Sequence, residues 1–305
     1  MIQFAEKSMV PALKEIWRRC FGDEEGYISL YFDRRFRPEE TLVYLNHGLP
    51  VGMLAMLPCE IVTDRGTVAS RYVYGVATLP EYQGRGYSSA LLEYAHRWMR
   101  KHEILVSVLV PAEESLFQFY RKRGYLPTFS VRQVRLSREE ILHLAQQGPA
   151  LQKPLTLEEV TAKEFYALRE EFFGYQGLFV RWDERALSYV MEENQFQEGK
   201  ILRFSTDYGH GYVVCYKIKN KIAVKECGAR DETMVCRALL SAFDEDLFEL
   251  RLAADSPLFM GLGEKREFAA AVYLGEVQDR GLLSLSERLT GRELLDSPYC
   301  NLVLD

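Results

Sequence analysis

The stretch from Tyr72 to Ser89, which reads YVYGVATLPEYQGRGYSS, constrains the fold more than any other part of the chain. Residues 72–79 are rich in β-branched and aromatic residues and end at Pro80, so they predict a strand followed by a turn. Two glycines and two serines follow, and apolar residues then recur at helical spacing from Leu91. A helix N-terminus that is entered through glycines presents unpaired backbone N–H groups and the positive end of the helix dipole. This order of strand, glycine loop and helix predicts an anion site, most often one for phosphate.

Two common phosphate-binding motifs do not account for this loop. A nucleoside-triphosphate loop reads GxxxxGK followed by Ser or Thr, and no lysine precedes Ser88. A dinucleotide fingerprint requires GxGxxG and an acidic residue about 20 residues further on, whereas Gly84 and Gly86 supply only its first two glycines. The loop therefore points to another class of phosphate-containing ligand.

Two segments resemble the motifs of one enzyme superfamily. The sequence Gln83-Gly84-Arg85-Gly86-Tyr87-Ser88 resembles the (Gln/Arg)-x-x-Gly-x-(Gly/Ala) signature of the GNAT superfamily of acyl-CoA-dependent N-acyltransferases, with Ser88 in place of its last small residue. Further on, the segment FYRKRGY, which ends at Tyr125, resembles the family's F-Y-x-x-x-G-(F/Y) motif, where a helix ends at glycine and a strand begins. The resemblance implies an α/β (α+β) fold, with a mixed central sheet flanked by helices, that binds an acyl-CoA.

Length and composition favour a soluble protein of two domains. The chain has 305 residues, 48% of them hydrophobic, and no apolar run approaches the roughly 18 residues of a membrane span. The N-terminal segment carries acidic residues and no long apolar run, unlike a signal peptide. Six cysteines without a CxxC pair predict reduced thiols, no metal site and a cytoplasmic location. A net charge of −6 without a basic block argues against nucleic acid as a partner and weakly favours a cationic acceptor.

The first domain is predicted to occupy residues 1–140. Its expected strands cover residues 41–46, 51–63, 67–79, 104–110 and 125–136. A short helix is expected over residues 114–123. In the GNAT fold, two N-terminal helices form the wall of the acceptor pocket. The resemblance therefore implies that Tyr27, Tyr31 and Phe36 line that pocket, while packing in the core explains each aromatic residue equally well.

A second domain is predicted over residues 150–305, after a helical segment and a linker that is rich in Gln, Gly and Pro. The order of elements repeats there, with helices near 161–173, 183–195 and 231–243. Strands are expected near 200–206, 211–217, 221–228 and 247–252. Asp231 and Glu232 stand where the phosphate loop would be; they suit a helix start but would repel a pyrophosphate. We therefore expect a degenerate second GNAT-like unit and one cofactor site per chain.

Two tandem GNAT units, the second without its loop, resemble the enhanced-intracellular-survival (Eis) type of acetyltransferase. That family adds a third, sterol-carrier-like domain, which this chain is too short to hold. Family members place their terminal carboxylate in the active site as the base. Whether Asp305, which follows a helical stretch near 282–295, does the same is open, and a surface tail is the alternative.

The resemblance also implies roles for individual residues. Tyr120 occupies the position of the family's catalytic tyrosine, the general acid that serves the departing thiolate; packing of the helix against the sheet is the alternative. Main-chain N–H groups where the strand splays would polarise the carbonyl and pair with the pantetheine amides, and the loop would hold the pyrophosphate. The predicted cofactor-binding residues are Val76, Ala77, Thr78, Gln83, Gly84, Arg85, Gly86, Tyr87, Ser88 and Ser89.

The general base is unassigned. A lysine-like amine is neutral in only about one molecule in a few thousand at pH 7, so a base or a water chain to one is expected. Many GNAT enzymes use a Glu on the strand before the loop, but residues 71–79 contain no acid. Glu60, Glu113 and Asp305 are the remaining options. A covalent mechanism through Cys20 or Cys59 is disfavoured, because no histidine is near either cysteine in the sequence.

These observations predict an acetyl-CoA-dependent N-acetyltransferase that moves an acetyl group directly to a primary amine in a ternary complex. The expected acceptor is a small molecule, with a peptide or protein amine as the main rival. A catalytically inactive acyl-CoA sensor or scaffold is the alternative from another class. The sequence predicts no membrane partner and leaves the oligomeric state open, with a homo-oligomer among the options.

Overall fold

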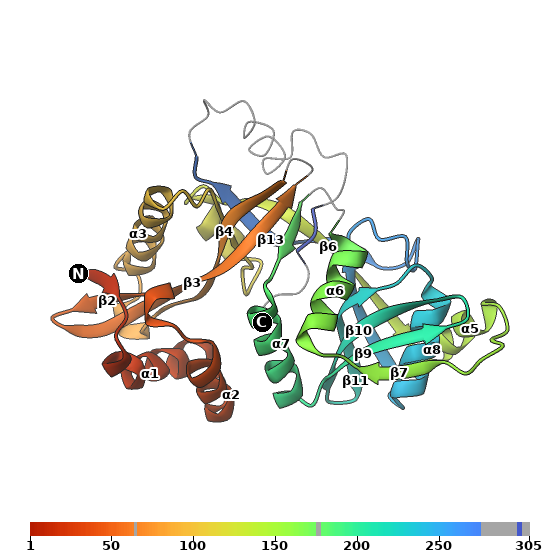
Figure 1. Cartoon of the computed structure of the whole chain (residues 1–305). Coiled ribbons are helices and arrows are strands. Elements are labelled where there is room, and N and C mark those ends of the chain that lie inside the picture. The colour runs from red at the N-terminus through yellow and green to blue at the C-terminus, as the bar shows by residue number, and fades with distance from the viewer. Residues whose placement is uncertain (64–65, 175–177, 276–297, 301–305) are drawn as a thin grey trace. The chain divides into compact units, whose positions relative to one another are not determined.

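The computed structural model describes residues 1–63, 66–174, 178–275 and 298–300, in two compact units (Figure 1). Among the described residues, the first unit comprises 1–128 and 269–275, and the second comprises 129–268 and 298–300. No helix in these ranges is long and apolar enough to cross a membrane.

The sheet of the first unit is mainly antiparallel. Strands β1 (Ile2–Phe4), β2 (Thr41–Asn46), β3 (Leu49–Thr63) and β4 (Gly66–Thr78) pair antiparallel in sequence order. β5 (Val106–Leu109) then pairs parallel with β4, and residues 270–273 of β13 (Glu264–Tyr273) pair with the other edge of β5. The predicted strands 41–46, 51–63, 67–79 and 104–110 are thus confirmed, the first with the predicted ends and the other three with slightly shifted ends.

Helices cover both faces of this sheet (Figure 1). The apolar stripe of α3 (Tyr87–Lys101), which includes Leu91, Ala95 and Met99, packs on the face that carries Leu54 and Met56. Helix α1 (Val10–Phe21) packs on β3 and β4, and α2 (Glu25–Leu30) continues into a π-helical turn at Tyr31–Arg35. The short helix α4 (Leu116–Arg121) lies within the predicted segment 114–123. Alternation along the strands places apolar side chains on both faces, so both faces must be covered.

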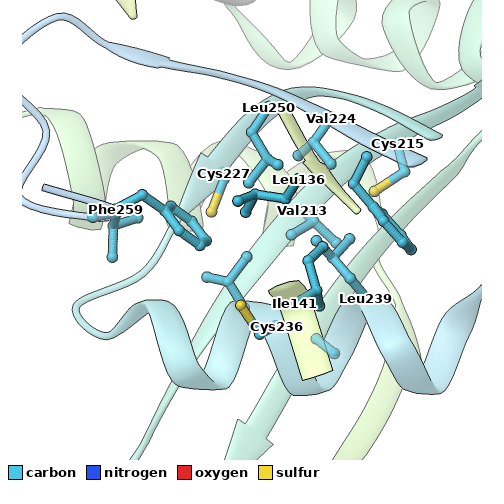
Figure 2. Packing of buried hydrophobic residues seen from close by; sticks show 14 of the residues in the cluster. Leu136, Ile141, Val213, Cys215, Val224, Cys227, Cys236, Leu239, Leu250 and Phe259 are labelled. Atoms are coloured by element: carbon cyan, nitrogen blue, oxygen red, sulfur yellow. The ribbon is translucent and has the colours of Figure 1, made fainter. Parts of the chain in front are cut away.

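The second unit has a hydrophobic core of its own. Its strands run in the order β6 (Leu126–Ser137), β12 (Leu247–Ala253), β11 (Lys221–Gly228), β10 (Gly209–Ile218), β9 (Lys200–Thr206) and β7 (Thr156–Glu159). β11 and β12 pair parallel, and the helix α8 (Glu232–Ala242) connects them. Helix α5 (Arg138–Gln147) packs against α8, and Figure 2 shows Ile141, Val213, Leu239 and Leu250 meeting in the core between helix and sheet.

Local sequence signals explain where the helices of this unit begin. Ser137 and Thr161 form capping boxes with the glutamates three residues later, at the starts of α5 and α6 (Ala162–Phe173). Asp183 caps α7 (Glu184–Phe196). The helices and strands predicted between residues 161 and 252 are all present. The short strand β8 (Phe179–Arg181) was not predicted, and the stretch 282–295 and Asp305 lie outside the described residues.

The division between the units differs from the predicted boundaries, 1–140 and 150–305. Strand 125–136 was predicted to complete the first domain. The strand is present as β6, but from Val131 to Ser137 it pairs antiparallel with β12 in the second unit. Residues 270–273 come from the second half of the sequence and pair with β5 in the first unit. Apolar patterning predicts that a segment is a strand but does not select its neighbour, since pairing depends on residues far away in the sequence.

Candidate active site

A β-bulge at Gly75 shapes the end of β4. Met53 pairs with Ala77 and Ala55 pairs with Tyr74, so two residues of β4, Gly75 and Val76, face a single residue of β3. Gly75 has φ +58°, and a Cβ there would lie 3.2 Å from the ring of Trp17. Both the left-handed backbone and the close ring require glycine. The sequence analysis missed Gly75, although an isolated glycine inside a strand pattern is a known sign of a bulge.

Strands β4 and β5 separate just before this bulge. Their parallel ladder joins Ser70 to Val106, Arg71 to Ser107 and Tyr72 to Val108, and within the described residues it goes no further. Residues 73–78 of β4 therefore leave that edge without a strand neighbour. Main-chain N–H and C=O groups along Val76, Ala77 and Thr78 can pair there with an extended amide-containing ligand.

The glycine loop leads directly into the N-terminus of α3. Gly84 and Gly86 have φ +73° and +80°, and nothing lies within 4 Å of a Cβ built on either. Gly86 is the N-cap residue without a side-chain cap, and the first intrahelical hydrogen bond runs from Ala90 N to Gly86 O at 3.0 Å. The N–H groups of Tyr87, Ser88 and Ser89 precede this bond, so they have no acceptor within the helix. Open N–H groups of this kind are what an anion site at a helix N-terminus uses, and anion binding here stays a prediction.

Other predicted residues hold the loop against β4. Gln83 Nε2 donates to Thr78 O at 3.0 Å, and the hydroxyls of Thr78 and Ser88 are 2.8 Å apart. Arg85 Nη2 donates to Glu81 O at 3.1 Å. Contacts between these side chains bring the strand end and the helix N-terminus together.

Aromatic rings cover the loop from one side. Tyr87 stacks on Tyr44 of β2 with ring centroids 4.0 Å apart and planes 16° apart, and the Arg85 guanidinium lies over the ring of Tyr82. Tyr87 therefore combines two features, a free N–H in the first turn of α3 and a ring that anchors this turn to the sheet.

Tyr120 lies on α4 and is 8% exposed. Its ring packs edge-on against Phe119 and Tyr125, and its hydroxyl makes no hydrogen bond to any described residue. Burial raises the pKa of Tyr120 to about 12, and the charge of Arg123 opposes this rise only in part. The phenol is therefore protonated at neutral pH, as a hydrogen-bond donor must be.

Arg123 is a residue that the sequence analysis missed. Its Nη2 donates to Ser89 Oγ in the first turn of α3, its Nη1 donates to Phe119 O, and its guanidinium lies 3.5 Å from the centroid of the Phe119 ring. Burial lowers the pKa of Arg123. The only sequence signal was the basic character of FYRKRGY, which does not reveal which of its three cations turns toward α3.

The described residues do not supply an evident base. β4 carries no acid. Glu60 pairs with Ala69, seven residues before Val76, which corresponds to roughly 20 Å along an extended strand. Glu113 is exposed and accepts a hydrogen bond from Ser115 at 3.3 Å, and Asp305 lies outside the described residues. The base stays unassigned.

Cys20 lies in α1, and its Sγ donates to Thr78 O at the end of β4, at 3.3 Å. Burial raises the pKa of this thiol, which opposes formation of a thiolate nucleophile. Cys59 is buried in β3. No cluster of three or more His, Cys, Asp or Glu side chains suited to a metal ion occurs among the residues that the structure describes.

The aromatic residues assigned to the acceptor wall are buried. Tyr31 is 0% exposed and packs against Trp17 with centroids 4.5 Å apart, and Phe36 packs against Phe32. The Tyr27 hydroxyl lies 3.3 Å from that of Tyr74 on β4. Tyr31 and Phe36 therefore act as core residues here, and Tyr27 stays a prediction for the acceptor wall.

The corresponding position in the second unit differs in charge. The Asp231 side chain accepts from Thr233 N at 2.8 Å and caps α8, and Glu232 follows in the first turn. In α8 a carboxylate thus accepts from a first-turn N–H group of the kind that α3 leaves open. The predicted helix cap is confirmed.

The first unit combines a splayed strand edge with an open helix N-terminus. Residues 1–128 match the sequence model described as acetyltransferase (GNAT) domain, and these residues form most of the first unit. No curated protein matches the sequence.

Solved structures show the fold of the whole chain. Eis1 from Mycobacterium abscessus is 16% identical with a TM-score of 0.66, over 90% of this chain and 74% of that one. A GCN5-related N-acetyltransferase from Anabaena variabilis is 17% identical with a TM-score of 0.71, over 90% and 73%. A tandem GNAT protein from the clavulanic acid biosynthesis pathway is 14% identical with a TM-score of 0.53, over 90% and 99%. The chain has the tandem GNAT fold, as predicted.

An acyl-CoA fits the residues that are present. The unpaired edge at residues 73–78 offers main-chain partners for amides, and the first turn of α3 offers N–H groups for phosphate. The Nε of Arg123 is a buried donor with no hydrogen-bond partner, so an anion beside it would satisfy this donor and pair with the guanidinium charge.

Proposed function

We propose that this protein is an acetyl-CoA-dependent N-acetyltransferase that transfers the acetyl group directly to a primary amine in a ternary complex. The observation that carries the proposal is the pairing of two features in one unit: the β4 edge opened at Gly75 and the N-terminus of α3, joined through Thr78 and Ser88. The match of residues 1–128 to an acetyltransferase domain supports the acetyl group.

In the proposed complex, bound acetyl-CoA supplies an acyl thioester. Gly84, Gly86 and the N–H groups of Tyr87 to Ser89 bind its pyrophosphate, because the helix dipole and open N–H groups favour an anion. Main-chain N–H groups near Val76 to Thr78 orient the arm and polarise the carbonyl.

Tyr120 donates a hydrogen bond to the leaving sulfur. A phenol of pKa about 12 facing a thiol of ordinary pKa 8.5 does not protonate it fully at equilibrium, so the hydroxyl stabilises the charge as it develops and then relays a proton. Its lack of a hydrogen-bond partner among the described residues leaves this donor available.

The acceptor is proposed to be a small amine, with a cationic one weakly favoured by the net charge of −6. The cytoplasmic location and the absence of nucleic-acid and membrane partners stay predictions from composition. Acceptor identity is the part of the proposal that an activity screen must supply.

Thiol release from acetyl-CoA across a panel of amines tests the proposal, together with a direct acetyl-CoA titration. We expect Tyr120→Phe to lower kcat at least about tenfold while the acetyl-CoA Kd stays within about twofold, because a positioned acid contributes roughly 100-fold or more. Tyr94→Phe removes a half-buried hydroxyl on α3 and serves as the matched control. Cofactor binding without turnover on any amine would favour the sensor alternative, and absence of binding would refute the cofactor site.

A further inference from the structure

The Arg123 guanidinium is an unusual cation for its surroundings. No carboxylate among the described residues forms an ion pair with it, and its Nε is buried without a hydrogen-bond partner. Its two recorded partners are neutral, the Phe119 carbonyl and the Ser89 hydroxyl. Partly buried cations are normally paired, because removal from water without an opposite charge is costly.

The location of this cation adds a second cost. Ser89 lies in the first turn of α3, and the N-terminus of a helix carries the positive end of the helix dipole. A positive side chain is disfavoured there, and no acidic residue occurs in that first turn. An anion beside Arg123 and the first-turn N–H groups removes both costs, because it pairs with the guanidinium and offsets the positive charge at the helix N-terminus.

The anion would meet an already oriented donor. The stack of Arg123 on Phe119 and its bond to the Phe119 carbonyl fix the side chain against α4, so little side-chain freedom remains to be lost on binding. Arginine also offers a planar set of donors that matches two phosphate oxygens.

We infer that Arg123 is a phosphate-binding residue of the acyl-CoA site, contacting a phosphate group beside the first turn of α3. The inference rests on the proposed function, since the phosphate is that of the acyl donor. In this arrangement the glycine loop with the first turn of α3 and the Arg123 side chain, just after α4, bind one phosphate group, although the two segments are distant in sequence.

Calorimetric titration of the full chain with CoA, 3′-dephospho-CoA and pantetheine tests the inference, because pantetheine lacks every phosphate. Arg123→Gln is expected to weaken CoA binding roughly 10- to 100-fold and to leave pantetheine binding within about twofold. Arg121→Gln, in the exposed last turn of α4, is the matched control and should change neither affinity. An equal loss for 3′-dephospho-CoA assigns the contact to the pyrophosphate, and no loss assigns it to the 3′-phosphate.

Each of the following results would overturn the inference. One is an Arg123→Gln protein that binds CoA as tightly as the wild type. Another is an equal loss of CoA and pantetheine affinity, which would make Arg123 a clamp between α3 and α4. If Arg123→Gln does not fold, Arg123→Lys must still bind CoA more weakly relative to pantetheine than the wild type does. A wild-type protein that binds no CoA would refute the proposed function itself and this inference with it.

Discussion

Residues 298–300 are held in the second unit by the main chain, the ring and the hydroxyl of Tyr299, and removal of the hydroxyl gives a sharp test. The Glu226 carboxylate is 0% exposed and accepts from Tyr212 at 2.7 Å and from Tyr299 at 2.8 Å. Arg169 on α6 pairs with both oxygens, at 2.9 and 3.2 Å. Burial acts to lower the pKa of Arg169, and the Glu226 carboxylate more than reverses this, so Arg169 stays charged.

Tyr299→Phe is expected to loosen the segment while the pair persists. A hydrogen bond to a charged group contributes about 1.5–3 kcal/mol, which corresponds to roughly 10- to 150-fold in an opening equilibrium. Two main-chain bonds remain, Tyr299 N to Leu178 O at 2.6 Å and Val180 N to Tyr299 O at 2.9 Å. The Tyr299 ring also stays stacked on Phe173 at 4.0 Å. The segment should therefore open more often without being lost.

Hydrogen exchange at the amides of Val180 and Tyr299 measures this opening directly. Tyr212→Phe is the control, because it removes a donor to the same carboxylate from the interior strand β10. Both variants should lower the melting temperature by roughly 4–8 °C, for a loss of about 2 kcal/mol in a unit of this size. Only Tyr299→Phe should raise exchange at the two amides by tenfold or more.

Equal exchange in the two variants would refute this reasoning. It would mean that the segment opens only together with the whole unit. Unchanged exchange in Tyr299→Phe would mean that the two main-chain bonds and the ring hold the segment without the hydroxyl.

Two further predictions concern other buried polar groups. Burial lowers the pKa of His96 to about 4, with Arg100 contributing, so folding favours the neutral ring that contacts the Tyr125 hydroxyl at 2.9 Å. The contribution of His96 to the free energy of unfolding is therefore full above the unfolded pKa of about 6.5 and falls by roughly 3 kcal/mol as the pH drops toward 4. Urea unfolding of His96→Gln should show a flatter pH profile over that window. Arg132 donates to four carbonyls of the turn at residues 256–262, at 2.6–2.8 Å. Arg132→Met should therefore destabilise the second unit by about 3 kcal/mol or more and expose the turn to proteolysis. The control Arg135→Met changes an exposed residue of the same strand and should destabilise the unit by less than about 1 kcal/mol.

Much of the first unit's site could be predicted because its signals are local. A strand, two glycines and a helix within residues 72–89 already specify an open helix N-terminus, since left-handed φ values at Gly84 and Gly86 depend on their own lack of a Cβ. The same holds for the alternating strands, which were placed nearly to the residue.

The parts that were missed depend on distant residues. Gly75 reads as one more residue of a strand until Trp17 and the β3 register show why a bulge lies there. Arg123 reads as one of three cations in a basic segment until α4's end is placed beside Ser89.

By itself, the sequence determined most of the helices and strands, the glycine loop and the absence of an acid on β4, because these follow from backbone preferences and from residue identity at short range. Only the tertiary structure decided which strands are neighbours, so that 131–137 pair in the second unit and 270–273 in the first. It also decided that Arg123 faces a helix N-terminus and that Tyr299 reaches Glu226. These contacts join residues 34 and 73 positions apart, and a sequence pattern of short period carries no information about such pairs.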